Sequence, residues 1–455
     1  MIEVVATAAV QQQAEAADLV GRWEGALRVG EVALPLVVRV SEGANGLVAV
    51  MDSPAQGARD IPIADLTRSA ETVRFAAPSI GGRFEGARSA DGSTLTGSWG
   101  QGGSGLPLIL TRNAATIEVV IPAAPERPQT PVPPFPYVAQ DVTFANTDAG
   151  ITLAGTLTMP EGAGPFPAVV LLTGSGAQDR DETILGHKPF AVWADALTRR
   201  GVAVLRYDDR GVGGSGGGSM DETTADFATD ARAAMDYLRT RPEIDAGRIG
   251  LMGHSEGGTA ALIATSQGAS AAFVVMIAGP SVSGAEILIE QSKQMLLAAG
   301  VTEAQAATAE AAQARFMLAV LNNKDDGPAV SAAVEALALE LGQSAERASS
   351  AAQVMGSGWY RYVVAYDPAA AIRTLNVPLF ALYGDRDRNV PAAQNAPHLE
   401  TLKPDATVVV LPGLNHLMQN AETGLPNEYS TLTETLAPEA ISAVTDWVVR
   451  VTGAR

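Results

Sequence analysis

The chain has 455 residues, of which 47 % are hydrophobic and 18 % charged, a composition typical of a folded protein with room for roughly two or three domains. It contains no cysteine, which excludes disulfides, thiolate–metal sites and cysteine nucleophiles, and its four histidines leave little for metal binding. Its formal net charge of −19 repels a phosphate backbone, so we expect no nucleic acid partner.

The apolar runs of the sequence are short. The run at residues 271–280 is half as long as the roughly 20 residues that a membrane helix needs, so no membrane span is expected. Residues 4–16 lack the basic start and long apolar core of a signal peptide, but they fit the remainder of a trimmed one. We expect a periplasmic or secreted protein if an upstream signal peptide has been removed, and a cytoplasmic one otherwise.

Residues 1–120 are expected to form a small antiparallel β-domain. Short alternating runs, such as residues 32–40, are separated by Gly, Ser, Asp and Asn at the spacing of a sandwich or barrel. Trp23 and Trp99 stand in similar contexts near the two ends of this region, and we interpret them as core aromatics. Residues 122–136 carry seven prolines, so residues 121–137 are expected to form a semi-rigid linker.

Residues 138–455 show a different pattern, in which apolar β-branched runs alternate with amphipathic stretches. The runs lie at residues 168–172, 202–207, 249–252, 273–277, 379–383 and 407–411. Buried strands that alternate with helices predict an α/β fold with a doubly wound, mostly parallel sheet. The connection between the runs at 273–277 and 379–383 is too long for one crossover helix. It contains a capping box at residues 302–305, so we expect a helical lid insertion at about residues 281–376.

The motif GHSEG at residues 253–257 lies directly after an expected strand and before an expected helix. This G-x-S-x-G pattern is typical of a nucleophile elbow, whose glycines permit a tight turn that exposes the serine hydroxyl. The N-terminus of the following helix favours developing negative charge. We therefore predict that Ser255 is a catalytic nucleophile.

A serine hydroxyl needs a base to take its proton and an acid to orient that base. In this fold both should follow later strands, in the order Ser, Asp, His. His416 follows the strand at 407–411 and is predicted to be the base. Asp385 and Asp387 both follow the strand at 379–383, and we favour Asp387 because it lies further around the turn.

The other histidines are given lesser roles. His398 lies in a polar loop and is expected at the surface. His254 is held inside the elbow and cannot be the base, while His187 follows a strand-end loop. We regard His187 and His254 as possible pocket residues.

Acyl transfer also requires backbone N–H donors for the oxyanion. We expect one from Glu256, the residue after the nucleophile, and one from Ser175, in the glycine-rich loop after the strand at 168–172. The charged run at 178–181 is either a pocket rim or an ion-pair network, and we favour the network. The G-x-G-x-x-G pattern at 211–216 is interpreted as a turn, because no helix follows it at once.

Residues 138–455 resemble the α/β-hydrolases, in particular bacterial carboxylesterases with a GHSEGG elbow, close to the dienelactone-hydrolase and prolyl-oligopeptidase branches. The resemblance is carried by TGSGAQDRDE (173–182), LRYDDRGVGGSGG (205–217), GRIGLMGHSEGG (247–258), YDP (366–368), GDRDRNVP (384–391) and GLNH (413–416). It implies the triad of Ser255, Asp387 and His416. Thr173, where many relatives carry histidine, and Ala177, where they often have proline, bear on the pocket shape without removing a required donor.

The sequence therefore predicts a serine carboxylesterase that acts on a small-molecule ester with a short to medium acyl chain and requires no cofactor or metal. The alternatives are a peptidase or amidase, a thioesterase, and a non-catalytic binding protein on a hydrolase scaffold. The acyl and alcohol preference and the oligomeric state do not follow from the sequence.

Overall fold

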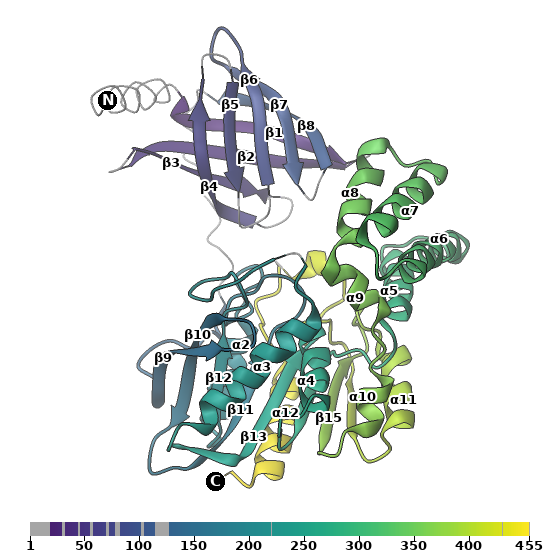
Figure 1. Cartoon of the computed structure of the whole chain (residues 1–455). Helices are drawn as coiled ribbons and strands as arrows, with labels where there is room; N and C mark the ends of the chain where they lie inside the picture. Colours follow the sequence, from purple (N-terminus) through teal and green to yellow (C-terminus); the bar gives the residue numbers. More distant parts are fainter. Residues whose placement is uncertain are drawn as a thin grey trace. The chain divides into compact units, whose positions relative to one another are not determined.

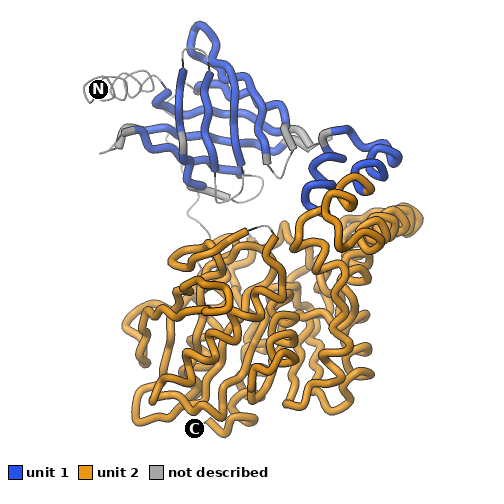
Figure 2. Tube along the Cα trace, viewed as in Figure 1, with its two compact units in different colours: residues 1–122, 334–354 blue, residues 123–333, 355–455 orange. Residues whose placement is uncertain are grey.

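The structure is a computed structural model that describes residues 19–29, 32–43, 46–54, 58–69, 72–77, 82–101, 104–113, 127–219, 221–429 and 431–454. The chain divides into two compact units, one of residues 1–122 and 334–354 and the other of residues 123–333 and 355–455 (Figure 2). The division after residue 122 falls inside the proline-rich segment. The grouping of residues 334–354 with the first unit has no counterpart in the sequence pattern.

The N-terminal strands form a closed antiparallel barrel, in which each strand pairs with the next and β1 also pairs with β8 (Figure 1). The strands are β1 (Gly21–Val29), β2 (Val32–Gly43), β3 (Gly46–Ser53), β4 (Ala58–Arg68), β5 (Thr72–Ala77), β6 (Gly82–Arg88), β7 (Thr94–Gln101) and β8 (Ser104–Asn113). Every second residue of β6 is buried, as the pleat requires. The prediction of a small antiparallel β-domain is confirmed, and of the two architectures left open it is the barrel.

Aromatic side chains fill the interior of this barrel. Trp23 and Trp99 are 1 % and 2 % exposed, and the rings of Phe75 and Phe84 stack with their centroids 4.9 Å apart. The indole N–H of Trp23 donates to the carbonyl oxygen of Leu19 at 2.9 Å. Side chains of this size are sufficient to fill a barrel of eight strands. The interpretation of both tryptophans as core residues is confirmed.

The second unit is built on a sheet of eight strands in the order β16-β15-β14-β13-β11-β12-β10-β9. The strands are β9 (Tyr137–Asn146), β10 (Ile151–Pro160), β11 (Phe166–Leu172), β12 (Ala203–Tyr207), β13 (Ile244–His254), β14 (Val274–Ile277), β15 (Leu379–Gly384) and β16 (Thr407–Leu411). The pairs that involve β10 are antiparallel, and all others are parallel. β14 and β15 are buried throughout, which explains why their sequences are unbroken apolar runs.

Helices cover both faces of this sheet (Figure 1). One core contains residues of α3 (Thr224–Arg239), α4 (Glu256–Ser266), α10 (Ala369–Thr374) and α11 (Ala392–Leu402), and the other residues of α2 (Pro189–Thr198) and α12 (Pro438–Thr452). Within β11, Val170 belongs to the first core and the adjacent Val169 to the second. The predicted doubly wound α/β fold is confirmed.

A helical insertion separates β14 from β15, although the two strands are neighbours in the sheet. Its helices are α5 (Gly284–Ala298), α6 (Glu303–Asn322), α7 (Gly327–Glu340), α8 (Ala345–Gly356), α9 (Gly358–Ala365) and α10. α6 begins with the expected capping box of Thr302 and Gln305. Within the described part of the chain, neither these nor the other helices have the length and apolar character needed to cross a bilayer.

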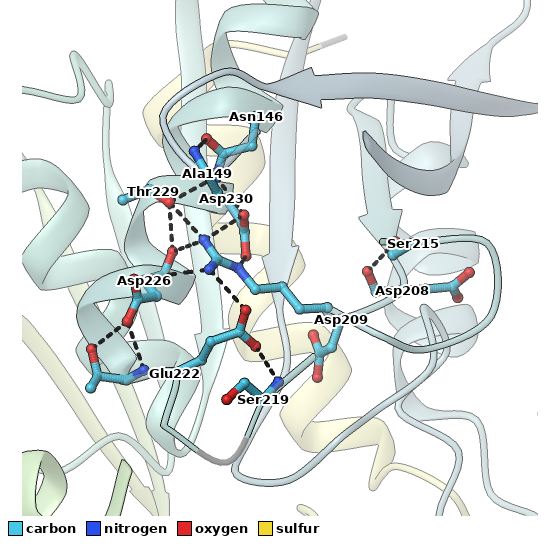
Figure 3. A network of polar contacts seen from close by, with 12 residues as sticks. Asn146, Ala149, Asp208, Asp209, Ser215, Ser219, Glu222, Asp226, Thr229 and Asp230 are labelled. Carbon is cyan, nitrogen blue, oxygen red and sulfur yellow. Dashed lines mark hydrogen bonds and ion pairs between the residues drawn. The ribbon is translucent and has the colours of Figure 1, made fainter. Parts of the chain in front are cut away.

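Charged side chains hold the loop after β12 (Figure 3). Arg210 donates to both carboxylate oxygens of Asp230 on α3, at 2.6 and 3.1 Å, and both side chains are almost fully buried. Asp208 accepts two hydrogen bonds from the guanidinium group of Arg180, at 3.0 and 2.7 Å. A Cβ atom at Gly213 would lie 2.4 Å from Asp208 Oδ2, so the glycine-rich segment is a turn around this carboxylate, as expected.

Replacement of Arg210 by alanine should leave Asp230 buried without its cation. We expect Arg210→Ala to lower the free energy of unfolding by about 3–5 kcal/mol in urea denaturation. Arg232→Ala is the matched control, because Arg232 lies on α3 together with Asp230. Arg232 pairs with the exposed Asp148 at 2.7 Å, so its loss should cost less than about 1 kcal/mol. Equal losses in the two variants would show that the buried ion pair contributes no more to the free energy of unfolding than the exposed one.

Candidate active site

Ser255 lies at the turn between β13 and α4, where its backbone has a φ of +51° and a ψ of −117°. A positive φ is strained for a residue with a side chain, and such strain is typical of a nucleophile elbow. The turn is also tight. A Cβ atom at Gly253 would lie 2.1 Å from the carbonyl carbon of Gly257, and one at Gly257 would lie 2.2 Å from the carbonyl oxygen of Leu172. Both glycines of the motif are therefore required by the backbone.

Asp387 and His416 form a buried pair in the loops after β15 and β16. The distance between Asp387 Oδ2 and His416 Nδ1 is 2.8 Å. Asp387 is 1 % exposed, and its Oδ1 accepts two backbone N–H groups of its own loop at 2.8 and 2.9 Å. Asp385 is exposed and accepts the N–H of Gly413 at 2.6 Å. Of the two candidate acids, the structure brings Asp387 to His416.

One cavity of about 320 Å³ is lined by Ser255 and His416 together with the two expected oxyanion residues, Ser175 and Glu256. The rest of its wall comes from strand-end loops and from the insertion. α5 contributes Ile287, Leu288 and Gln291, and α9 contributes Trp359, Tyr360 and Val363. A concave, largely apolar site with a few convergent polar groups is the usual form of a small-molecule site. The cavity therefore offers a place for a substrate beside the candidate nucleophile.

Trp359 connects the insertion to the elbow. Its indole N–H lies 3.0 and 3.1 Å from the two carboxylate oxygens of Glu256, and the hydroxyl of Thr224 donates to Oε1 of the same carboxylate at 2.6 Å. The Glu256 side chain is thus occupied in building the cavity wall. Its backbone N–H lies at the first position of α4, where the helix carries partial positive charge.

Asp209 holds both ends of the glycine-rich loop that contains Ser175. Its carboxylate accepts the hydroxyl of Thr173 at 2.6 Å and the N–H of Gln178 at 2.9 Å, and its own N–H donates to the carbonyl oxygen of Gln178 at 3.0 Å. Burial raises the pKa of Asp209 to about 8, against the opposing effect of these two hydrogen bonds. The loop that borders the cavity therefore depends on a carboxyl group that titrates near neutral pH.

His254 and His187 occupy different positions. His254 lines the cavity, and its ring centroid lies 4.8 Å from that of His416. His187 is fully buried and does not belong to the residues that line this cavity, which differs from our expectation. Its Nε2 lies 2.9 Å from the carbonyl oxygen of Tyr429 and its Nδ1 3.0 Å from the hydroxyl of Thr435. Burial lowers the pKa of His187, so it supports a wall residue as a neutral side chain.

The charged run at 178–181 contains both kinds of residue that we considered. Gln178 lines the cavity, whereas Arg180 and Asp181 form ion pairs. The next residue, Glu182, is 4 % exposed and lines the cavity, although it is not among the site residues predicted from the sequence. Asp209 and Trp359 were missed as well. For Glu182 and Asp209, the available signal is that they lie in two of the six segments that carry the family resemblance.

The chain is similar to known hydrolases. The family described as "Serine aminopeptidase, S33" (Hydrolase_4) matches residues 188–423. The chain belongs to this family. The matched range contains Ser255, Asp387 and His416.

Esterase EstD of Thermotoga maritima is 29 % identical over 308 residues, which cover 66 % of this chain and 64 % of that protein. The alignment thus spans slightly less than two thirds of EstD. Mitochondrial acyl-coenzyme A thioesterase 2 of Homo sapiens is 32 % identical over 106 residues, 23 % of this chain and 19 % of that protein. Among solved structures, an esterase of Pyrococcus furiosus is 16 % identical with a TM-score of 0.42, over 70 % of this chain and 92 % of the other.

The raised pKa of Asp209 predicts a specific pH dependence of stability. Between the unfolded pKa of about 4 and the folded value of about 8, the folded protein holds a proton that the unfolded chain has released, so stability falls as pH rises through this range. Asp209→Asn cannot ionise. Its urea midpoint relative to wild type should therefore increase from pH 5 to pH 8.

Asp245→Asn is the control for this measurement. Arg248 holds the pKa of Asp245 below its usual value, so the group stays ionised above pH 5 in both states. The difference between Asp245→Asn and wild type should be constant from pH 5 to pH 8. A constant difference for Asp209→Asn as well would show that Asp209 is already ionised at pH 5.

Proposed function

We propose that the protein is a serine carboxylesterase that hydrolyses short to medium acyl esters through a covalent acyl-enzyme. The observation that carries this proposal is the meeting of Ser255 and His416 at one cavity, with Asp387 bonded to the far nitrogen of the histidine at 2.8 Å. Membership of a serine hydrolase family supports the reaction type. The similarity to an esterase over 308 residues supports the substrate class.

The proposed reaction begins when Ser255 Oγ attacks the ester carbonyl carbon while His416 Nε2 takes its proton. Asp387 holds the Nδ1–H of His416 and stabilises the imidazolium that forms. The backbone N–H groups of Ser175 and Glu256 donate to the oxyanion of the tetrahedral intermediate. His416 then protonates the leaving alcohol, and in the second half of the reaction it activates the water that releases the acid.

The size of the cavity supports the short to medium acyl range. A volume of about 320 Å³ is at the lower end of ligand sites, which run from about 300 to 1,000 Å³. Trp359 and Tyr360 add two large rings to its wall from α9. Long acyl chains would have to displace these side chains.

Two other reactions use the same chemistry. The family takes its description from serine aminopeptidases, and one relative is a thioesterase. An amide has a poorer leaving group, an amine that must be protonated, whereas a thioester expels a thiolate that needs no protonation. The three classes of substrate therefore differ in their leaving group. A substrate panel of one acyl group on p-nitrophenol, p-nitroaniline and a thiol distinguishes them.

The catalytic assignment predicts the effect of three substitutions on p-nitrophenyl acetate, butyrate and octanoate hydrolysis. Ser255→Ala should lower kcat by about 10⁴-fold or more, and Asp387→Asn by about 10⁴-fold, because the neutral amide favours the wrong histidine tautomer. Asp385→Asn removes the neighbouring exposed carboxylate and should leave kcat within about twofold. Equal activity in Asp385→Asn and Asp387→Asn would refute the assignment of the acid.

An inert wild-type protein calls for a second measurement. Labelling of Ser255 by a fluorophosphonate would show a working serine hydrolase with another substrate. The absence of labelling at Ser255 would favour the alternative of a binding protein on a hydrolase scaffold.

The wall position of Trp359 predicts a change in chain-length preference. Trp359→Ala should raise the ratio of kcat/KM for octanoate to that for butyrate by about tenfold, because two added methylene groups or more find room where the indole was. Trp359→Phe keeps most of the ring volume and loses the bond to Glu256, so its ratio should stay near that of wild type. The same shift in both variants would assign chain-length selection to the Glu256 bond.

A further inference from the structure

Both ring nitrogens of His254 lie against hydrogen-bond acceptors. Nδ1 lies 2.8 Å from the carboxylate oxygen Oε1 of Glu182, and Nε2 lies 3.0 Å from the backbone carbonyl oxygen of His416. A carboxylate and a carbonyl can only accept, and a neutral imidazole carries one N–H. With Glu182 ionised, both hydrogen bonds therefore form only when His254 is an imidazolium, and the two residues are then a buried ion pair.

The electrostatics agree with this geometry. Burial by itself lowers the pKa of His254, but the charge and hydrogen bond of Glu182 and the hydrogen bond to His416 outweigh it and raise the pKa above its usual value. The charge of Asp387 acts in the same direction. Glu182, Asp387 and His416 are the ionisable groups that face His254 from the loops after β11, β15 and β16.

Glu182 extends the contact to the loop that contains Ser175. Its Oε1 also accepts the backbone N–H of Gly174 at 2.7 Å. A Cβ atom at Gly174 would lie 3.2 Å from this oxygen, 3.2 Å from Nδ1 of His254 and 3.4 Å from Cβ of Ser255. The backbone beside Ser175 therefore lies directly against both the ion pair and the nucleophile.

We propose that Glu182 and His254 form a positioning pair, which holds the loop of Ser175 and the backbone of His416 in register around Ser255. This inference rests on the proposed hydrolase function. The pair joins three parts of the site: the N–H that precedes Ser175, the elbow, to which His254 itself belongs, and the backbone carbonyl of the proposed base. A neutral His254 can keep one of its two bonds, so the pair also makes the site sensitive to alkaline pH.

Variants of Glu182 test the proposal by ester hydrolysis over a range of pH. Glu182→Ala removes the acceptor for both Gly174 and His254 and should lower kcat by about 10²-fold with little change in KM, as expected for a misplaced reacting group. Glu182→Gln retains an oxygen acceptor but not the charge. It should keep most of the kcat at pH 6–7, and its loss of activity at alkaline pH should begin at least about one pH unit lower than in wild type, because the imidazolium loses its counter-charge.

Asp179→Ala is the matched control. Asp179 is a carboxylate of the same loop that accepts two backbone N–H groups, of Asp181 and Thr183 at 3.0 and 2.9 Å, and it does not line the cavity. Its loss should loosen the loop without moving the alkaline limb of the pH profile. A Glu182→Gln profile identical to that of wild type, or an equal shift in Asp179→Ala, would overturn the proposal.

A direct measurement of protonation does not depend on activity. In ¹⁵N NMR spectra of the histidine rings at pH 7.5, His254 should carry protons on both nitrogens in wild type and on one in Glu182→Gln, with its signals identified by their absence from His254→Asn. A neutral His254 in wild type would refute the ion pair even if esters are hydrolysed. Failure of wild type to hydrolyse esters would instead count against the proposed function, and the rate of fluorophosphonate labelling of Ser255 would then compare the Glu182 variants.

Discussion

The backbone turn at Ser255 leaves no space for a side chain at Gly253 or Gly257, and the other parts of the site are arranged around it. The N–H of Ser255 donates to the carbonyl oxygen of Ile277 on β14 at 2.8 Å, while the carbonyl oxygen of Leu172 on β11 limits the space at Gly257. The turn is therefore held between the two strands that flank β13. Because parallel strands end at one edge of the sheet, the loops after β11, β15 and β16 reach the same point, and each brings a residue to the cavity.

Acidic side chains hold these loops in place. Asp387, Asp209 and Glu182 each accept at least one backbone N–H group in addition to a side-chain partner. A carboxyl group has two oxygen atoms that can each accept hydrogen bonds, so a single residue can fix two segments of chain relative to each other. Part of the chain's acidic composition thus serves loop geometry around the site.

The main features of the fold and the residues proposed for catalysis could be predicted because they follow local patterns. Gly253 and Gly257 are required by the turn itself, and His416 follows the apolar run of β16, so all three positions can be recognised in the sequence. Alternating runs predicted the strands of the N-terminal unit, but its closure as a barrel depends on the pairing of β1 with β8, which lie far apart in the sequence.

The residues that were missed act through tertiary contacts. Glu182 has a φ of +51°, a conformation that no sequence pattern indicates for glutamate, and it reaches His254 from 72 positions away. Trp359 reaches Glu256 across 103 positions from a helix of the insertion. His187 follows a strand-end loop, as a pocket residue would, yet its bonds to Tyr429 and Thr435 form across more than 240 positions. Such contacts depend on packing that neither periodicity nor motif spacing encodes.

The insertion leaves the sheet at β14 and returns at β15, its direct neighbour, with Val274 in register with Leu379. The insertion therefore begins and ends at two strands that are already paired with each other. The entropy of closing a loop grows with the logarithm of its length, so doubling the excursion would cost about 0.6 kcal/mol. Among the described residues, α6, α7 and α8 contribute nothing to the two cores that flank the sheet, so these helices can change in length with little effect on the strands that carry Ser255, Asp387 and His416. The length of the insertion can thus change while the sheet keeps the proposed catalytic groups in place.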